Sequence, residues 1–516
     1  MKKENAKRLT ALLLCAMTVM PAAMTACSDG GSNADNNKAE TLPMTDESTP
    51  VVTGDDSSAD QTGSGALAEI ESDYDWKSGV TQKDYNGHEF VILNGCTASW
   101  YSYTSIAPEE TTGEPVNDAF VERNLRTSDF LNITIKENND GDSMNILKNS
   151  VKAGTNDFDV ALVTLMNSFA VAMENNIFDL NTLESADFSK TWWDQNAVND
   201  LTINNKLYFV TSDFDTTRFD GIRSLYFNKA MIEQLGLENP YDLVDNNQWT
   251  MDKFTEMCTS VVADKDGDGV MTDADQYGYV SYSELMGDLL LYGMNERYIS
   301  KDPETGHIID MTGTEKFFDA YEKVYNLLYR EQDAVFDVRA SKHSAHLNGQ
   351  GDRAQEIIFT ANNALFYSEC MAWTRVLRDM EADFGVLPPP KYNEEQDRYY
   401  SVIINPFMQM IPITAEDPER TLHVMDVLAA ASHDTVVEAY VNVTLTGKVA
   451  RDADTVRMLH LVFDELAYNL HFSSVGVRGI VSGAVVAGTE NIASSLQKNQ
   501  KVFKKQLEKT NQFFFG

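Results

Sequence analysis

Positive charge is scarce in this chain of 516 residues, which carries 41 lysines and arginines against 79 aspartates and glutamates. The formal net charge is therefore −38 at pH 7. A surface this acidic repels the phosphate backbone of DNA and RNA, so the composition excludes nucleic acid as a partner.

Cysteine is scarce too. Of five cysteines, Cys15 and Cys27 lie near the N-terminus, which leaves Cys96, Cys258 and Cys370 for the body of the protein. Three thiols cannot all pair with one another, and none stands in a C-x-x-C pattern. We therefore expect no disulfide framework and no zinc or redox centre.

Long apolar runs are missing after the N-terminal segment. No later stretch approaches the roughly 18 apolar residues that a membrane span requires, so the body is expected to be soluble. Hydrophobic residues make up 43% of the chain and charged residues 23%, which are ordinary globular values. The length predicts two or three domains or one large unit of two lobes.

Residues 1–26 have the features of an export signal. Basic residues precede a short apolar run from Leu9 to Pro21, and small residues stand directly before Cys27. This pattern resembles a bacterial lipoprotein signal, which implies cleavage before Cys27 and acylation of its sulfur. The mature protein would then be lipid-anchored at the extracytoplasmic face of the cell membrane. An ordinary secretory signal with an incidental cysteine is the alternative, and it also means export.

Residues 27–78 are rich in serine, threonine, aspartate and glycine and nearly free of aromatic residues. Such a composition cannot bury enough apolar surface to fold, so we predict a disordered acidic tether.

A regular alternation of elements follows. Strands are predicted at Phe90–Leu93, 131–137 and Phe158–Val163, with helices at Val116–Leu125 and 144–154 between them. This order is typical of an α/β fold, a parallel sheet covered by helices. Four further amphipathic helices are expected, the first capped by Thr250, at 253–262, 315–329, 418–431 and 453–466.

Several segments occur together in an order that resembles one family. The most specific are "LYFNKAMIEQLGL" at 225–237, the W-T-x-x-x-F pattern that begins at Trp249, and "GVLPPP" at 385–390. With "EPVNDAFVERNLRTSDFLNITIKE" and "LTGKVARDADTVRMLHLVFDE", they are similar to family 1 extracellular solute-binding proteins, which include the maltose-binding protein. These are receptors of ABC importers for carbohydrates.

The resemblance implies a periplasmic-binding-protein-like α/β fold, with ligand held in a cleft between two lobes. Residues 84–210 and 381–430 would form the N-terminal lobe, and 218–380 and 431–510 the C-terminal lobe. The chain would cross between lobes near 211–219 and again near 385–390. The partners implied are a sugar or oligosaccharide and the transmembrane subunits of an ABC permease, with the receptor acting as a monomer.

The stretch "DKDGDGVMTDAD", residues 264–275, has the ligand order of a calcium loop. Oxygen donors at this spacing wrap a hard cation, and Gly269 permits the sharp turn between them. Position 12 is aspartate rather than the usual glutamate, and a solvated acidic turn without metal is the alternative. Because only one such loop is present, we expect a structural Ca²⁺ and not a sensor. The predicted ligands are Asp264, Asp266, Asp268, Val270, Thr272 and Asp275.

Sugar sites combine aromatic faces with a few carboxylates and amides. Trp100 and Tyr101 follow the first predicted strand, and loops at the carboxyl ends of parallel strands are where ligands bind in open α/β sheets. Packing against their own lobe is the alternative for both residues. The other candidates are Asp213 and Asp215 in the first crossing, and Tyr367 and Trp373 in the second lobe.

Two other functions share these features. A cell-surface glycoside hydrolase needs two carboxyl groups about 5 to 9.5 Å apart, which sequence alone does not exclude among 79 acids. A non-transport carbohydrate-binding lipoprotein is less favoured, because such modules are usually β-sandwiches. No motif of a serine hydrolase, zinc protease or P-loop is present, so we expect a receptor and not an enzyme.

Overall fold

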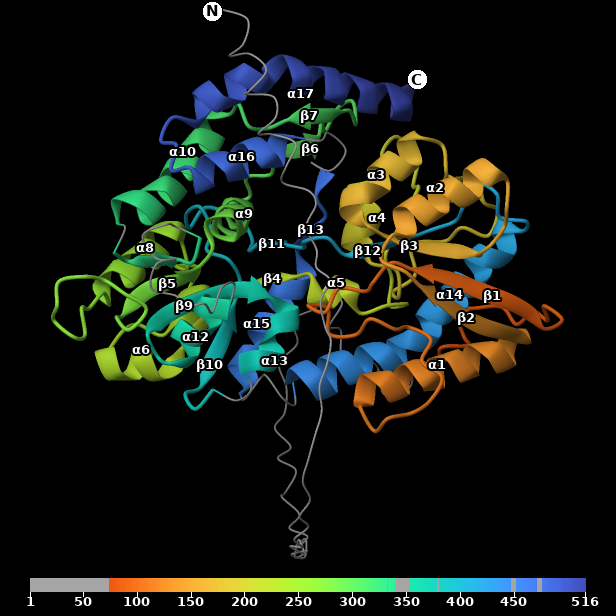
Figure 1. Cartoon of the computed structure of the whole chain (residues 1–516), viewed down its shortest axis with the longest axis horizontal. Coiled ribbons are helices and arrows are strands. Elements are labelled where there is room, and N and C mark those ends of the chain that lie inside the picture. The colour runs from red at the N-terminus through yellow and green to blue at the C-terminus, as the bar shows by residue number, and fades with distance from the viewer. Residues whose placement is uncertain (1–73, 332, 340–352, 378–379, 447–451, 471–475) are drawn as a thin grey trace, which may run out of the picture. The chain divides into compact units, whose positions relative to one another are not determined.

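The computed structural model describes residues 74–331, 333–339, 353–377, 380–446, 452–470 and 476–516 (Figure 1). The predicted signal segment, Cys27 and the tether up to residue 73 lie outside the described residues. Residues 74–78 were also predicted to belong to the disordered tether, but they pack on the fold: Trp76 is buried, and the Tyr74 hydroxyl donates to the carbonyl oxygen of Ala430 at 3.1 Å. Among the helices that are described, none combines the length and apolar character needed to cross a bilayer.

The first sheet has four strands in the order β12-β3-β1-β2. Strand β1 (His88–Asn94) pairs in parallel with both β2 (Ile133–Asn139) and β3 (Val160–Thr164). Strand β12 (Phe407–Met410) joins from much later in the chain and runs antiparallel to β3. The predicted order of strands and helices is therefore confirmed, with one added antiparallel edge strand.

The helices of this lobe follow from local sequence. α1 (Pro115–Leu131) begins at a proline and is capped by Glu114, whose carboxylate accepts from the backbone N–H of Asn117 at 2.9 Å. The remaining helices that pack around this sheet are α2 (Ser143–Ala153), α3 (Leu165–Met173), α4 (Gln195–Leu201) and α14 (Pro418–Ser432).

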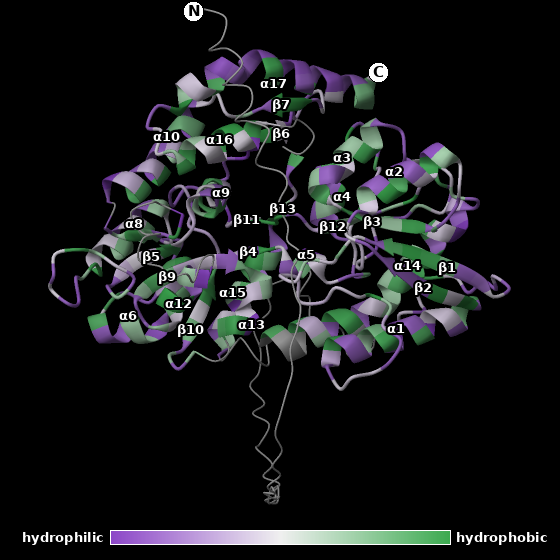
Figure 2. Cartoon of the chain, viewed as in Figure 1, coloured by the Kyte–Doolittle hydropathy of each residue, from purple (hydrophilic) through white to green (hydrophobic). Residues whose placement is uncertain are grey.

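The second sheet has five strands in the order β10-β4-β9-β5-β8. At its centre β9 (Ala364–Cys370) pairs in parallel with β5 (Tyr277–Ser281) and antiparallel with β4 (Arg223–Asn228). The edges are β8 (Val335–Asp337), parallel to β5, and β10 (Phe384–Leu387), antiparallel to β4. β4, β5 and β9 are buried along their whole length, although each combines polar and apolar residues (Figure 2).

Helix α8 (Met251–Ser260) starts at Thr250, whose hydroxyl accepts from the Lys253 N–H, so the predicted cap is confirmed. The other helices after the first crossing are α5 (Thr217–Asp220), α6 (Lys229–Leu235), α7 (Pro240–Asp245), α9 (Ser283–Gly293), α10 (Glu315–Tyr325), α12 (Ala354–Thr360), α13 (Thr374–Leu377), α15 (Ala453–Asp464), α16 (Val477–Val486) and α17 (Ile492–Phe515). Two small pairings complete the fold: β6 (Ile299–Lys301) with β7 (Ile308–Asp310), and β11 (Ser401–Val402) with β13 (Leu466–Ala467).

The structure corrects two predicted lobe boundaries. β10 belongs to the second sheet although its residues fall in the 381–430 range assigned to the N-terminal lobe, so the chain returns to the first sheet only between Leu387 and Phe407. At the other boundary, the π-helical segment His433–Val437 packs on α1, although 431–510 was assigned to the C-terminal lobe. The first boundary therefore depends on strand pairing and the second on helix packing, and neither contact can be located from the sequence alone.

Candidate functional site

A pocket of about 230 Å³ opens at the carboxyl edge of the first sheet. Trp100 and Tyr101 line it from the loop after β1, where the sequence predicted ligand contacts. Polar groups from three other segments complete the lining: Ser143 at the start of α2, Thr164 at the end of β3, and Asn405 before β12. The pocket thus combines aromatic and polar surfaces with one carboxylate, that of Asp142, a mixture typical of small-molecule sites.

The backbone at the end of β1 is held tightly against its neighbours. A Cβ atom on Gly95 would lie 2.2 Å from Ser143 Oγ and 2.8 Å from the carbonyl oxygen of Leu162. Glycine is therefore required for this close approach, which sets the direction of the loop that carries Trp100.

Trp100 and Tyr101 form a stacked pair, with ring centroids 3.6 Å apart and planes inclined by 29°. The Tyr101 hydroxyl donates to the carbonyl oxygen of Asn405 at 2.9 Å, and burial raises the pKa of that hydroxyl above its usual range. Tyr101 is only 4% exposed, whereas Trp100 is half-buried. Tyr101 supports the Trp100 ring, and Trp100 presents the more exposed aromatic surface of the pair.

Arg375 connects this loop to the second lobe. It lies in α13, which follows β9 after the 3-10 turn Met371–Trp373. Its guanidinium donates to the carbonyl oxygens of Ser99 and Trp100, each at 3.2 Å. The same guanidinium lies 5.8 Å from the ring of Trp373. The structure therefore brings Trp373 to the same junction as Trp100, and both stay predicted ligand contacts.

The carboxyl ends of β5 and β9 carry charged groups that the sequence analysis missed. Arg223 Nη1 lies 2.5 Å from Glu369 Oε1, and the Tyr282 hydroxyl donates to Glu369 Oε2 at 3.0 Å. Arg339 lies over the Tyr282 ring at 4.7 Å and pairs with Glu284. A charged residue inside an apolar strand, as in "LFYSEC", was the available signal.

Tyr367 does not reach any ligand site, which corrects its prediction. Its ring is fully buried in the central strand β9, stacked between Tyr226 and Phe359 with centroid distances of 5.5 and 5.3 Å. Its hydroxyl has no hydrogen-bond partner among the described residues. Tyr367 is part of the core because its strand is covered on both faces.

Asp213 is also buried and is committed to protein partners. It pairs with Arg218, and its other oxygen lies 2.6 Å from His433 Nδ1. Arg218 also contacts Asp194, which accepts a hydrogen bond from the Tyr468 hydroxyl at 2.8 Å. This network ties the first crossing to later segments, so the ligand prediction for Asp213 is wrong.

Asp215 is also buried, and its carboxylate bonds only to protein groups among the described residues. One oxygen accepts from the backbone N–H and the hydroxyl of Thr217, and the other accepts from Gln409 Nε2 at 3.1 Å. Because the side chain is fully buried and both oxygens are satisfied, Asp215 fixes the crossing to β12 rather than binding ligand.

A third carboxylate at the crossing was not predicted. Asp220 accepts from the Ser102 N–H and from the Tyr440 hydroxyl, each at 2.7 Å. Burial raises the pKa of Asp220 to about 6. Asp220 thus connects the loop that carries Trp100 to the end of the first crossing.

The predicted calcium loop brings three of its carboxylates together. One oxygen each from Asp264, Asp266 and Asp268 lie within 4.8 Å of one another, and all three side chains are exposed. Asp264 also accepts from the N–H of Gly269 at 2.8 Å, and Gly269 has the positive φ of 81° that the turn requires. Carboxylate oxygens at this separation fit a hard cation.

Asp275 lies outside that group of three. It is fully buried, and its oxygens accept from the N–H groups of Lys265 at 2.8 Å and Thr272 at 2.7 Å. It therefore closes the base of the loop. The roles of Val270, Thr272 and Asp275 as metal ligands stay predictions.

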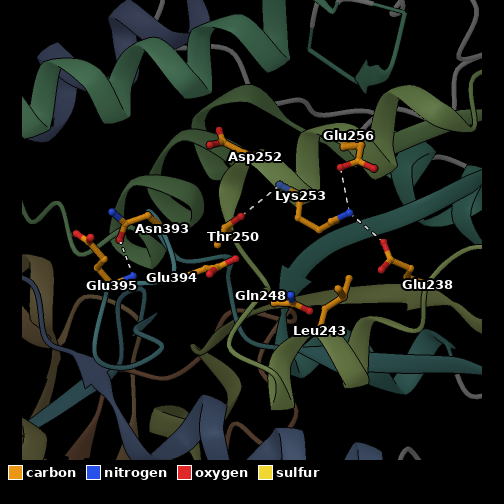
Figure 3. A pocket seen from close by; sticks show the side chains of 10 residues that line it. All are labelled: Glu238, Leu243, Gln248, Thr250, Asp252, Lys253, Glu256, Asn393, Glu394 and Glu395. Atoms are coloured by element: carbon orange, nitrogen blue, oxygen red, sulfur yellow. Dashed lines mark hydrogen bonds and ion pairs between the residues drawn. The ribbon is translucent and has the colours of Figure 1, made fainter.

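A larger hollow of about 580 Å³ lies between the start of α8 and residues 393–395 (Figure 3). Carboxylates dominate its lining, and the one lysine there, Lys253, already pairs with Glu238 at 2.9 Å and Glu256 at 3.0 Å. None of the predicted ligand residues lines it, and its acidic walls do not match an uncharged sugar.

No protein-family model and no curated protein sequence matches the chain. Solved structures do match. A cyclo/maltodextrin-binding protein complexed with maltotetraose superposes with a TM-score of 0.56 at 11% identity, over 82% of this chain and 98% of that one.

Two others are comparable. A cyclic α-maltosyl-1,6-maltose-binding protein from Arthrobacter globiformis gives a TM-score of 0.54 at 13% identity, covering 82% of this chain and 99% of its own. UspC from M. tuberculosis gives 0.53 at 14% identity, covering 81% and 100%. The chain therefore has the two-lobed α/β fold of periplasmic binding proteins, as the sequence predicted.

Proposed function

We propose that this protein is an extracytoplasmic receptor that binds a sugar or oligosaccharide between its lobes and delivers it to an ABC permease. The observation that carries the proposal is the pocket at the carboxyl edge of the first sheet, which Trp100 lines together with polar residues. Arg375 of the second lobe donates to the carbonyl oxygen of Trp100 beside it. The structural neighbours that bind maltotetraose or cyclic maltosyl-maltose support the ligand class.

The ligand would be held by complementary surfaces. A pyranose presents an apolar C–H face that packs on an indole ring, and its hydroxyls exchange hydrogen bonds with amides such as those of Asn167 and Asn405. A pocket of about 230 Å³ is smaller than the usual range for drug-sized ligands, so it fits one sugar unit. Further units of an oligosaccharide would extend toward Trp373 and the charged edge of the second sheet.

Lobe closure would transmit the signal. A ligand that contacts both lobes only when they are closed has a higher affinity for that state, and this difference shifts the population toward it. The permease would then recognise the closed arrangement.

A thermal-shift screen over oligosaccharides tests the function. A ligand at about 100 times its dissociation constant adds roughly 2.7 kcal/mol to the free energy of unfolding, which raises the melting temperature measurably. Mass spectrometry of the ligand after incubation separates a receptor from a glycoside hydrolase, because a receptor returns the ligand intact. Cleaved products, or no stabilising sugar in a broad panel, would count against the proposal.

We also propose that the mature chain begins at an acylated Cys27 and acts as a lipid-anchored monomer. The small residues before Cys27 and the acidic tether after it support this. The Cys27→Ser variant is expected to move from the membrane fraction to the soluble fraction of cells. Light scattering of that soluble form tests the monomer.

Finally, we propose that residues 264–275 hold a structural Ca²⁺ ion. Asp264, Asp266 and Asp268 would supply the first ligands, with oxygen donors later in the loop completing the shell. An isolated loop of this kind binds in the range of about 10⁻⁴ to 10⁻³ M, which suits an exported protein.

A further inference from the structure

The last helix of this acidic protein carries a row of lysines. α17 contains five lysines and a single glutamate, Glu508. Its buried residues are Ile492, Phe503, Leu507, Thr510 and Phe514. Residues two positions apart lie about 200° around a helix, so Lys505, between Phe503 and Leu507, points away from the protein body. We call the exposed row on this outer face the lysine stripe: Lys498, Lys501, Lys505 and Lys509.

Within the described part of the chain, no carboxylate lies within ion-pair distance of these four lysines or of the adjacent Lys504. Elsewhere lysines do find partners: Lys190 lies 2.6 Å from Asp426, and Lys323 lies 2.6 Å from Asp252. Among the described residues, one face of α17 thus carries four lysines without a carboxylate partner.

The helix that presents the stripe is firmly held. It packs beside α16 and β7 (Figure 1), where the Asn511 side chain exchanges two hydrogen bonds with the backbone of Ile308, at 2.8 and 2.9 Å. Near its end, the carbonyl oxygen of Phe514 accepts from Asn204 Nδ2 at 2.9 Å. The four charges are therefore displayed on a rigid row about 17 Å long, at about 1.5 Å per residue.

We propose that the lysine stripe is a docking surface for the anionic headgroups of a phospholipid bilayer. Charge complementarity supports this partner. A row of lysines without carboxylate partners among the described residues can bind a surface of uniform negative charge, and such a surface requires no matching shape on the protein. A protein partner would call for aromatic or apolar anchors, and Val502, 61% exposed, is the only large hydrophobic residue fully displayed on α17. The proposed acylation of Cys27 would also hold the chain at a membrane.

The net charge of −38 does not prevent such docking. Salt screens charges beyond about 10 Å at 0.1 M ionic strength, so a bilayer in contact with the stripe responds mainly to the nearest groups. The repelled acidic faces would then orient the protein with α17 toward the lipid. Because the apolar side of α17 is buried in the protein, the contact is electrostatic and involves no insertion.

Vesicle co-sedimentation tests the proposal, which goes beyond the sugar-receptor function and does not depend on sugar binding. The full chain with Cys27→Ser, which cannot be acylated, is mixed with vesicles that contain phosphatidylglycerol or with vesicles of phosphatidylcholine alone. We expect binding to the first only, and its loss as salt rises toward 1 M, where the screening length falls to about 3 Å.

A charge-matched pair of variants makes the test specific. Each lysine near an anionic surface contributes about fivefold to binding, so replacing the four lysines of the stripe by glutamine should weaken vesicle binding at least tenfold. The control removes the same charge from exposed lysines elsewhere, and its binding should stay close to that of the parent. Its substitutions are Lys77→Gln, Lys83→Gln, Lys136→Gln and Lys152→Gln. Circular dichroism confirms that both variants fold.

Three results would overturn the proposal. One is equal binding to both vesicle types, and another is an equal loss in the two fourfold variants. The third is binding to a soluble poly(glycerol phosphate) without binding to vesicles, which would assign the stripe to an anionic wall polymer instead.

Discussion

Arg375 Nη1 donates to the carbonyl oxygen of Trp100 at 3.2 Å, so the helix after β9 in the second sheet is joined to the loop after β1 in the first. The Arg375 guanidinium makes further hydrogen bonds to Ser99 and Ser102 of that loop. One side chain thus couples the lobes directly at the proposed ligand site.

Replacing Arg375 by alanine should loosen the two lobes in the absence of ligand. Hydrogen bonds from a charged donor contribute about 1.5 to 3 kcal/mol each, and three of them would be lost. We expect a larger radius of gyration by small-angle X-ray scattering. Arg457→Ala, which breaks exposed pairs with Asp245 and Asp454 within the second lobe, is the control. An unchanged radius in both variants would show that Arg375 does not hold the lobes.

Trp100→Ala should separate binding from stability. The half-buried ring contributes little to the core, so we expect sugar affinity to fall at least tenfold, or about 1.4 kcal/mol, with a small change in melting temperature. Trp249→Ala should do the reverse. Its indole is fully buried and donates to the carbonyl oxygen of Pro388, and its loss should cost about 3 to 5 kcal/mol of unfolding free energy. Calorimetry measures the sugar affinity of both variants, and thermal melts measure their stability. If Trp100→Ala binds sugar as tightly as the parent, Trp100 is not part of the site.

Tyr367→Phe should leave ligand affinity unchanged and the fold as stable as before, or more stable by about 1 kcal/mol. The substitution removes a buried hydroxyl that has no hydrogen-bond partner among the described residues. Tyr279→Phe provides the contrast. The Tyr279 hydroxyl is 2.6 Å from Ser368 Oγ, so its removal should cost about 1 kcal/mol. Urea denaturation measures both, and a clear loss of ligand affinity in Tyr367→Phe would restore that residue to the site.

His433 should make stability depend on pH. Burial lowers the pKa of His433, but its hydrogen bond to Asp213 and the charge of that carboxylate outweigh burial, so the pKa is raised above 6.5. A raised pKa means that protonation stabilises the folded state. This stability is fully present below pH 6.5, the pKa in the unfolded chain, and is lost as pH rises through the higher folded value.

Comparison of the parent with His433→Gln by urea denaturation at several pH values checks this. The parent's advantage should be largest on the acid side and decrease toward higher pH. A constant difference across the series would contradict the assignment.

Calcium removal should lower the melting temperature. An ion at about 100 times its dissociation constant contributes roughly 2.7 kcal/mol, so EDTA should destabilise the parent. Asp264→Asn should abolish the difference between calcium and EDTA, because Asp264 belongs to the group of three carboxylates. Asp273→Asn alters an acid of the same loop outside that group and should preserve the difference. Equal melts of the parent with and without EDTA would rule out a structural ion.

The sequence determined much of the framework by local chemistry. The apolar run Phe90–Leu93 specified β1, and the hydroxyl of Thr250 specified the start of α8, because these depend on neighbours along the chain. The aromatic pair after β1 was predictable as well, since loops at the carboxyl ends of parallel strands converge at one edge.

The tertiary structure decided which candidates are accessible. Asp213, Asp215 and Tyr367 have the residue types of a sugar site, but burial and the partners supplied by Arg218, Gln409 and Phe359 make them structural. The same holds for the interlobe contact of Arg375 and for the lysine stripe, whose outward direction depends on what α17 packs against. The propensity to form a helix or strand depends on consecutive residues. The exposure of a side chain and its hydrogen-bond partners depend on segments hundreds of residues apart, which only the folded chain brings together.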